Sequence, residues 1–370
     1  MQNAGSWYSF SRGKSRAESP PKPGSAARGV VDRTVDHSFY FLVSSFSYCA
    51  DGLGDREMID GICALAAQLR PETPIPRIRI QWEDQKEIGA GIVRKRGFFR
   101  TPLDEFPLPA QCQLVPVEML LPAKQPAGQL PPCYLHLASL GESGFQLRRR
   151  VALPLIREGF GALFMETAFH GQRKPRKQFQ GCVRRLSDLF VMTLSTFLEG
   201  RACLEWLHAQ GHPRLGVAGY SMGGFLSAGI AALTPHPLAV VCGAAGNCAS
   251  RTFTDKELDL RRLFDWKAMQ SCLEEGQDAA AYFAARLREI RLDKMPCPVL
   301  PAAAIVMGAQ HDCVVPQSEV LALHDHWKGS ELRWISTGHV LGLLLHWEEM
   351  RQAIRDAFSR LDALVPLPRD

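Results

Sequence analysis

One stretch, Gly219 to Gly224 with the sequence Gly-Tyr-Ser-Met-Gly-Gly, constrains the fold more than any other part of the chain. A short apolar run precedes it, and residues typical of a helix follow it as far as Leu233. A strand, a sharp turn with a central serine and then a helix are the context of the G-x-S-x-G nucleophile elbow. The residues two before and two after the serine are glycines because side chains there would collide with the turn. The pattern predicts that Ser221 lies at a strand end with its hydroxyl available for nucleophilic chemistry.

Around this stretch, short apolar segments alternate with helical ones from about Gln111 onwards. Strands that are nearly continuous apolar runs, separated by helices, are typical of a buried parallel sheet. We therefore expect an α/β fold with a mostly parallel central sheet flanked by helices. The expected strands are Val115–Leu121, Cys133–Ala138, Gly161–Met165, Leu215–Ala218, Leu238–Cys242, Ala302–Met307 and Leu332–Ile335, and the longest expected helices are Leu186–His208 and Trp347–Leu364.

The rest of the chain suggests a simple domain organisation. Residues 1–30 are rich in Ser, Pro and Gly and have an excess of Arg and Lys over acid, which fits either a disordered leader or an organelle transit segment. Residues 31–96 are expected to form a helical or irregular extension, and residues 97–370 the main domain. Within that domain, residues 251–295 interrupt the strand rhythm and are expected to form a helical insertion that caps the sheet.

Composition excludes several function classes. The net charge of +5 comes without a dense basic run interleaved with aromatics, so no nucleic-acid partner is expected. No apolar run reaches transmembrane length, although contact with a membrane surface stays compatible with the sequence. The 11 cysteines include no C-x-x-C pair and fit no metal-binding spacing, so neither a metal nor a cofactor is expected. Reduced thiols predict an intracellular compartment, either cytoplasmic or organellar.

A nucleophilic serine needs a base and an acid, which in this type of chain follow the serine in the order acid and then histidine. Asp312 comes just after the expected strand Ala302–Met307, in a loop that ends at a proline. His339 follows the last expected strand, in the sequence Ser-Thr-Gly-His before the final helix. The sequence therefore predicts a triad of Ser221, Asp312 and His339.

Two further groups of residues are candidates for the site. An oxyanion hole needs two backbone N–H donors, and we expect one from Met222 and the other from Ser139 or Leu140 in the loop after Cys133–Ala138. Arg173 and Lys174 lie in a loop that can overhang the site, where they could hold a phosphate or carboxylate of the substrate. A solvated basic loop is the alternative for this pair.

The chain also resembles the α/β-hydrolase domain-containing protein 18 family over about Gly97 to Leu361. The resemblance implies an α/β-hydrolase fold, a serine hydrolase with a lipid acyl ester as substrate, and the same three residues Ser221, Asp312 and His339 as its triad. The segments that carry it are Gly97–Pro102, Arg173–Pro175, Leu186–Met192, Ser221–Gly224, Gly338–His339 and Arg351–Ile354.

These observations lead to one expected function and two alternatives. We expect hydrolysis of a carboxylic ester, with a small-molecule acyl ester or lipid as the substrate, through an acyl-enzyme on Ser221. The same triad could instead transfer the acyl group to another alcohol or thiol. A non-catalytic binding protein with this fold is the alternative from a different class, because a fold does not determine function.

Overall fold

The computed structural model describes residues 26–43, 46–89, 91–103, 106–124 and 129–366. Most of the expected leader over residues 1–30 lies outside the described residues, and its last part, from Ala26, belongs to the first helix. The helices are α1 (Ala26–Val43), α2 (Arg56–Gln68), α3 (Gln146–Arg157), α4 (Leu186–Ala209), α5 (Met222–Leu233), α6 (Ser250–Thr254), α7 (Trp266–Gln270), α8 (Ala279–Glu289), α9 (Gln317–His326), α10 (His339–Leu345) and α11 (Trp347–Leu364).

The centre of the fold is a nine-stranded sheet with the order β1-β2-β3-β5-β4-β6-β7-β8-β9. The strands from β5 to β9 in this order pair in parallel, whereas β1, β2 and β3 pair antiparallel at one edge. Their bounds are β1 (Gln81–Glu87), β2 (Ile92–Arg100), β3 (Leu114–Pro122), β4 (Cys133–Leu137), β5 (Gly161–Met165), β6 (Leu215–Tyr220), β7 (Ala239–Gly243), β8 (Ala304–Ala309) and β9 (Glu331–Ile335).

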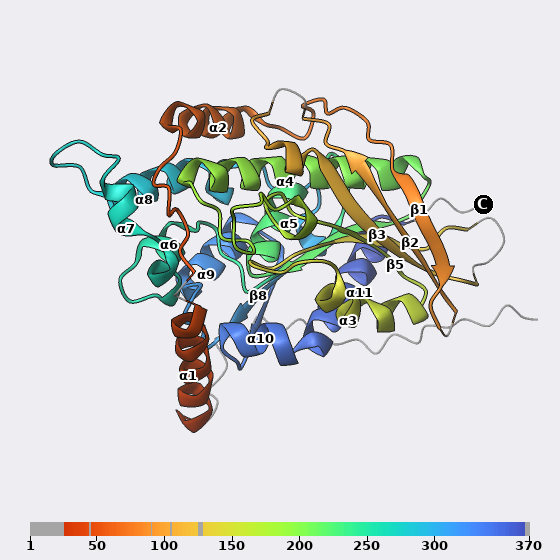
Figure 1. Cartoon of the computed structure of the whole chain (residues 1–370). Coiled ribbons are helices and arrows are strands. Elements are labelled where there is room, and N and C mark those ends of the chain that lie inside the picture. The colour runs from red at the N-terminus through yellow and green to blue at the C-terminus, as the bar shows by residue number, and fades with distance from the viewer. Residues whose placement is uncertain (1–25, 44–45, 90, 104–105, 125–128, 367–370) are drawn as a thin grey trace, which may run out of the picture.

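Both faces of the parallel part are buried, because helices cover each of them. In β7, Val240 and Cys242 join the core under α4 and α5, while Ala239 and Val241 join the core under α3 and α11. Since side chains alternate along a strand, a strand that is apolar at every position suits a sheet covered twice. Figure 1 shows α4 and α5 on one side of the sheet and α3 and α11 on the other.

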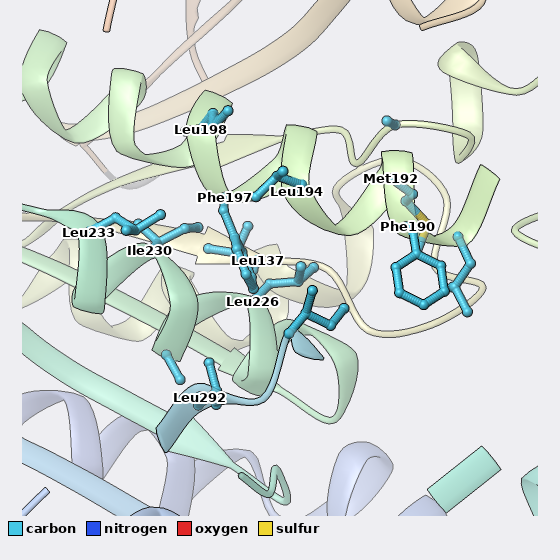
Figure 2. Close-up of a cluster of buried hydrophobic side chains, with 14 of the residues drawn as sticks. Leu137, Phe190, Met192, Leu194, Phe197, Leu198, Leu226, Ile230, Leu233 and Leu292 are labelled. Carbon is cyan, nitrogen blue, oxygen red and sulfur yellow. The ribbon is translucent and has the colours of Figure 1, made fainter. Parts of the chain in front are cut away.

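The apolar core between α4 and α5 holds the turn that carries Ser221 in place. α4 is buried along most of its length, so it lacks the polar face of a surface helix. Phe197 of α4 lies against Leu226 and Ile230 of α5, with Leu137 of β4 beneath them (Figure 2). This packing fixes α5, and with it the turn that carries Ser221.

Two sequence expectations need correction. The range 31–96 contains β1 and most of β2, so the expected boundary at residue 97 falls inside a strand rather than between domains. β1 is exposed or half-buried at each position and carries charges, as edge strands do, and its apolar pattern is therefore too weak to reveal it. His339 was expected in a loop, but it is the first residue of the short helix α10.

The expected insertion over residues 251–295 corresponds to short helices between β7 and β8, with no strand among them. They are α6, the 3₁₀ turn η3 (Asp259–Leu263), α7, α8 and the 3₁₀ turn η4 (Leu292–Lys294). Among the described residues, no helix combines the length and the apolar character that crossing a membrane would take.

Candidate active site

Ser221 lies at the sharp turn between β6 and α5. Its backbone has φ 57° and ψ −124°, a conformation that a residue with a side chain adopts only when the surroundings impose it. A Cβ on Gly219 would lie 2.3 Å from the backbone of Gly223, and a Cβ on Gly223 would lie 2.7 Å from the carbonyl oxygen of Leu137. The glycines of the pattern are therefore needed because the backbones pass too close for side chains.

The structure brings Ser221, His339 and Asp312 together in one hydrogen-bonded chain. His339 Nε2 lies 2.7 Å from Ser221 Oγ, and His339 Nδ1 lies 2.7 Å from Asp312 Oδ2. Because a carboxylate only accepts, Nδ1 carries the proton, and Nε2 accepts the hydrogen bond from the serine hydroxyl. The geometry is that of a nucleophile, a base and an orienting acid.

Asp312 and His339 are buried and held by further contacts. Asp312 Oδ1 accepts from the amides of Val314 and Val315, both at 2.8 Å. The hydroxyl of Tyr220 donates to the carbonyl oxygen of His339 at 3.0 Å. Burial acts to lower the pKa of His339, but the charge and hydrogen bond of Asp312 and the charge of Asp36 outweigh it, so this pKa is raised from its usual 6.5.

The structure distinguishes between the two candidates for the second oxyanion donor. The amide of Ser139 donates to Glu142 Oε2 at 3.2 Å, and its hydroxyl donates to the carbonyl of Tyr220 at 3.0 Å. Within the described part of the chain, the amides of Leu140 and Met222 have no acceptor. Leu140 and Met222 both line the same cavity as Ser221, whereas Ser139 does not. Leu140 is therefore the better placed of the two.

Buried polar contacts fix the loop that carries Leu140. Glu142 pairs with Arg148 of α3 at 2.9 Å, and the amide of Gly141 donates to His170 Nε2 at 3.3 Å. Burial lowers the pKa of His170 to about 4, so the ring is neutral at physiological pH. Its Nδ1 then donates to the carbonyl of Ala168, which leaves Nε2 as an acceptor for Gly141. Sequence reasoning missed these supports because they come from separate strands and helices.

Ser221 opens onto a cavity between α4, α5 and the helices that follow β7. Its walls are almost entirely apolar, with Thr193, Thr252 and Cys248 as the polar exceptions beside Ser221. The apolar side chains are Leu140, Leu189, Phe190, Met192, Met222, Phe225, Leu226, Ala245, Ala249, Phe253, Leu260, Leu287, Ile290, Val314 and Val315.

Arg173 and Lys174, predicted as substrate contacts, do not reach this cavity. Arg173 is fully buried and forms a bidentate ion pair with Glu199 of α4, with both N–O distances at 2.7 Å. Lys174 Nζ donates to the carbonyl oxygen of Gln178 at 2.6 Å. The basic pair is therefore part of the framework, and the prediction of a phosphate or carboxylate contact is wrong in geometry. The sequence alone does not show whether a charged residue is buried or exposed, so the burial of Arg173 could not be predicted.

A single group of side chains in the described residues has the composition of a metal site. The ligand atoms of His37, Asp259 and Cys313 lie within 4.8 Å of one another. His37 Nδ1 pairs with Asp259 at 2.8 Å, and burial raises the pKa of the Cys313 thiol to about 12. Because metals bind the thiolate, this cysteine is a poor ligand at neutral pH, and the group fits a local hydrogen-bond cluster better.

Comparison with known proteins relates the chain to a family and to solved structures with a similar fold. The family model described as "Alpha/beta hydrolase domain containing 18" matches residues 48–282 and 266–360, which is most of the chain. The structure is similar to an acetyl xylan esterase from Paenibacillus sp. R4, with a TM-score of 0.55 and 16% identity over 85% of this chain and 98% of that one. It is also similar to acetyl xylan esterase 1 from Thermoanaerobacterium sp. JW/SL YS485, with a TM-score of 0.51 and 15% identity over the same shares.

At these identities the likeness to solved structures concerns the fold. It confirms the α/β-hydrolase fold expected from the sequence, a mostly parallel sheet flanked by helices. The match over most of the chain likewise confirms the family resemblance found in the sequence motifs.

Proposed function

We propose that this chain, which belongs to the alpha/beta hydrolase domain containing 18 family, hydrolyses carboxylic esters of apolar acyl groups through an acyl-enzyme on Ser221. One observation carries the proposal: Ser221, Met222 and Leu140 line a cavity whose other walls are nearly all apolar. A nucleophile, two free amide donors and an apolar cavity are what an ester carbonyl attached to an acyl chain requires.

The reaction begins when Ser221 Oγ attacks the ester carbonyl carbon while His339 Nε2 accepts the hydroxyl proton. The amides of Leu140 and Met222 stabilise the negative oxygen of the tetrahedral intermediate, and Met222 does so at the start of α5, where the helix dipole favours negative charge. His339 then gives its proton to the leaving alcohol oxygen, which breaks the ester bond. In the second half of the reaction, His339 accepts a proton from water, and the water oxygen attacks the acyl carbonyl carbon. His339 then returns the proton to Ser221 Oγ as the carboxylic acid leaves.

The cavity implies a preference for long acyl chains. Each methylene that leaves water contributes about 0.8 kcal/mol, or about fourfold in binding. Octanoate has six more methylenes than acetate, and burial of about three of them is expected to raise kcat/KM for p-nitrophenyl octanoate above that for p-nitrophenyl acetate by about 60-fold. Spectrophotometric rates over the acetate-to-decanoate series measure this. Equal or falling kcat/KM with chain length would contradict the apolar acyl substrate, and no ester turnover by folded protein would contradict the proposed function.

A matched pair of variants connects this preference to the cavity. Ala249 lines the cavity at the start of α6, and Ala249→Phe would fill part of it. We expect this variant to lose most of the octanoate activity and to keep acetate activity within about threefold. Ala285 is exposed on α8, so Ala285→Phe is the control and is expected to change neither rate.

The pH dependence follows from the state of His339. The imidazole must be neutral to accept the Ser221 proton, and its pKa is raised from 6.5. Below that pKa the ring is protonated and inactive, so kcat/KM is expected to rise with pH and to reach half its maximum above pH 6.5. Rates between about pH 5 and pH 9 at constant ionic strength test this, with thermal unfolding as the control that the protein stays folded. A midpoint at or below 6.5 would be inconsistent with these contacts.

A further inference from the structure

Helix α1 places a buried carboxylate beside two of the three triad residues, from a part of the chain far away in sequence. Asp36 Oδ2 accepts from the amide of His339 at 2.8 Å across 303 residues. Asp36 Oδ1 accepts from the amide of Val340 at 2.8 Å, and Oδ2 also accepts from the amide of Cys313 at 3.3 Å. The Asp36 side chain is fully buried.

These three amides belong to the segments that carry the proposed base and acid. His339 and Val340 begin α10, and Cys313 directly follows Asp312. Hydrogen bonds to an ionised acceptor are the strong ones in proteins. One carboxylate therefore ties the acid segment to the base segment from outside the triad.

Helix α1 buries acidic side chains and exposes several apolar ones, unlike an ordinary amphipathic helix. The four-residue spacing of Asp32, Asp36 and Tyr40 puts them on one face, and all three are buried. Val30 and Leu42, by contrast, are exposed. Tyr40 joins the apolar core and Val35 and Val43 pack against it, but helices normally bury most of their apolar residues, so the polar contacts of Asp32 and Asp36 also help to place α1.

The surface against which α1 packs has no side chain at Gly338, where α1 comes closest. A Cβ on Gly338 would lie 2.9 Å from the carbonyl oxygen of Asp32 and 3.0 Å from Asp36 Oδ2, so a larger residue there would push the helix away. α1 packs against α10 and η3 and projects from the side of the domain beside α10 (Figure 1).

We infer that Asp36 is a positioning residue for Asp312 and His339, and that α1 supports the active site through this side chain. The inference rests on the proposed function. Asp36 touches no reacting atom, so it acts by holding the two segments at the distances that the triad needs. Misplacement of a catalytic group by about 1 Å can cost about 100-fold in rate.

Asp36 also acts through its charge. The groups that face His339 are Ser221, Asp312, Tyr220 and Asp36, with the buried Tyr40 beside the two carboxylates. Burial raises the pKa of the Asp36 carboxyl, while the amides of Val340 and His339 and the charge of His339 act in the opposite direction. The ionised carboxylate favours the protonated imidazole and, after Asp312, raises the pKa of His339. If Asp36 only anchored α1, its replacement would not change the pH at which His339 titrates.

Asp36→Asn is the test, with Asp32→Asn as its matched control. Asp32 is a buried carboxylate one turn earlier on the same face, and its nearest ionic neighbour is His311 at 4.0 Å rather than the triad. For Asp36→Asn with p-nitrophenyl octanoate we expect kcat to fall by about 10- to 100-fold and KM to stay within about threefold. The acid limb of kcat/KM should move to lower pH, because the pKa of His339 falls. For Asp32→Asn we expect kcat to stay within about threefold of wild type.

Each outcome separates this inference from the function on which it rests. If wild type hydrolyses esters and Asp36→Asn keeps its kcat and its acid limb, the positioning role is wrong. An equal loss in Asp32→Asn also overturns it, since the effect would then come from α1 as a whole. If Asp36→Asn does not fold, Asp36→Ser takes its place, because a hydroxyl still accepts one amide, and the same kcat and pH criteria apply. A wild type that is folded but inactive would instead overturn the proposed function.

Discussion

Ser221→Ala is expected to lower kcat/KM for p-nitrophenyl octanoate by about 10⁴-fold or more. The alanine has no atom that can attack the carbonyl, so the acyl-enzyme cannot form, and only binding and the oxyanion donors remain. A serine-directed fluorophosphonate probe should label wild type and fail to label the variant. Both readouts use the intact protein and need no knowledge of the natural ester.

The same substitution should leave stability nearly unchanged. Ser221 makes no side-chain capping hydrogen bond to α5, and alanine would occupy the same φ of 57° with the same backbone strain. We therefore expect the unfolding midpoint of Ser221→Ala to match wild type, which assigns the lost activity to chemistry rather than folding. Ser227→Ala is the control: Ser227 lies in the same helix, is buried and donates to the carbonyl of Gly223, away from the cavity. It should keep its labelling. Labelling that persists in Ser221→Ala would mean that another nucleophile reacts.

The parts of the site that could be predicted from sequence are those whose chemistry is local. The turn around Ser221 is specified within six residues, because the close backbone approach demands glycines at fixed positions. Asp312 and His339 each follow a strand of the parallel part of the sheet, and parallel strands bring their carboxyl ends to one edge. These three positions therefore follow from strand order alone.

The contacts that were missed are non-local. Asp36 meets His339 across 303 residues, and the sequence of α1 does not mark its buried face, which carries Asp32 and Asp36 beside Tyr40. The antiparallel strands β1 and β2 were missed for a related reason, since charged half-exposed strands lack the apolar run that reveals a central one. Sequence patterns reveal what burial of apolar groups requires, and they reveal little about buried polar pairs.

The ion pair of Arg173 with Glu199 is the clearest case, and it gives the largest expected effect on stability. Both side chains are fully buried, and the guanidinium also donates to the carbonyl oxygens of Cys112 and Glu166. Arg173→Met would leave the Glu199 carboxylate without a partner in the core, so we expect a loss of about 3–5 kcal/mol in the free energy of unfolding. Urea unfolding followed by circular dichroism measures it.

Two comparisons test the cause of this loss. The double variant Arg173→Met/Glu199→Leu removes both charges and should be more stable than Arg173→Met, because an unpaired buried charge costs more than an absent pair. Lys174→Met removes the neighbouring cation, which is only half-buried, and should cost no more than about 1 kcal/mol. If Arg173→Met instead kept wild-type stability and raised KM for the ester, Arg173 would contact substrate after all, and the arrangement with Glu199 would have to open during binding. We expect unchanged KM in the folded variant, because Arg173 lies outside the cavity that Ser221 lines.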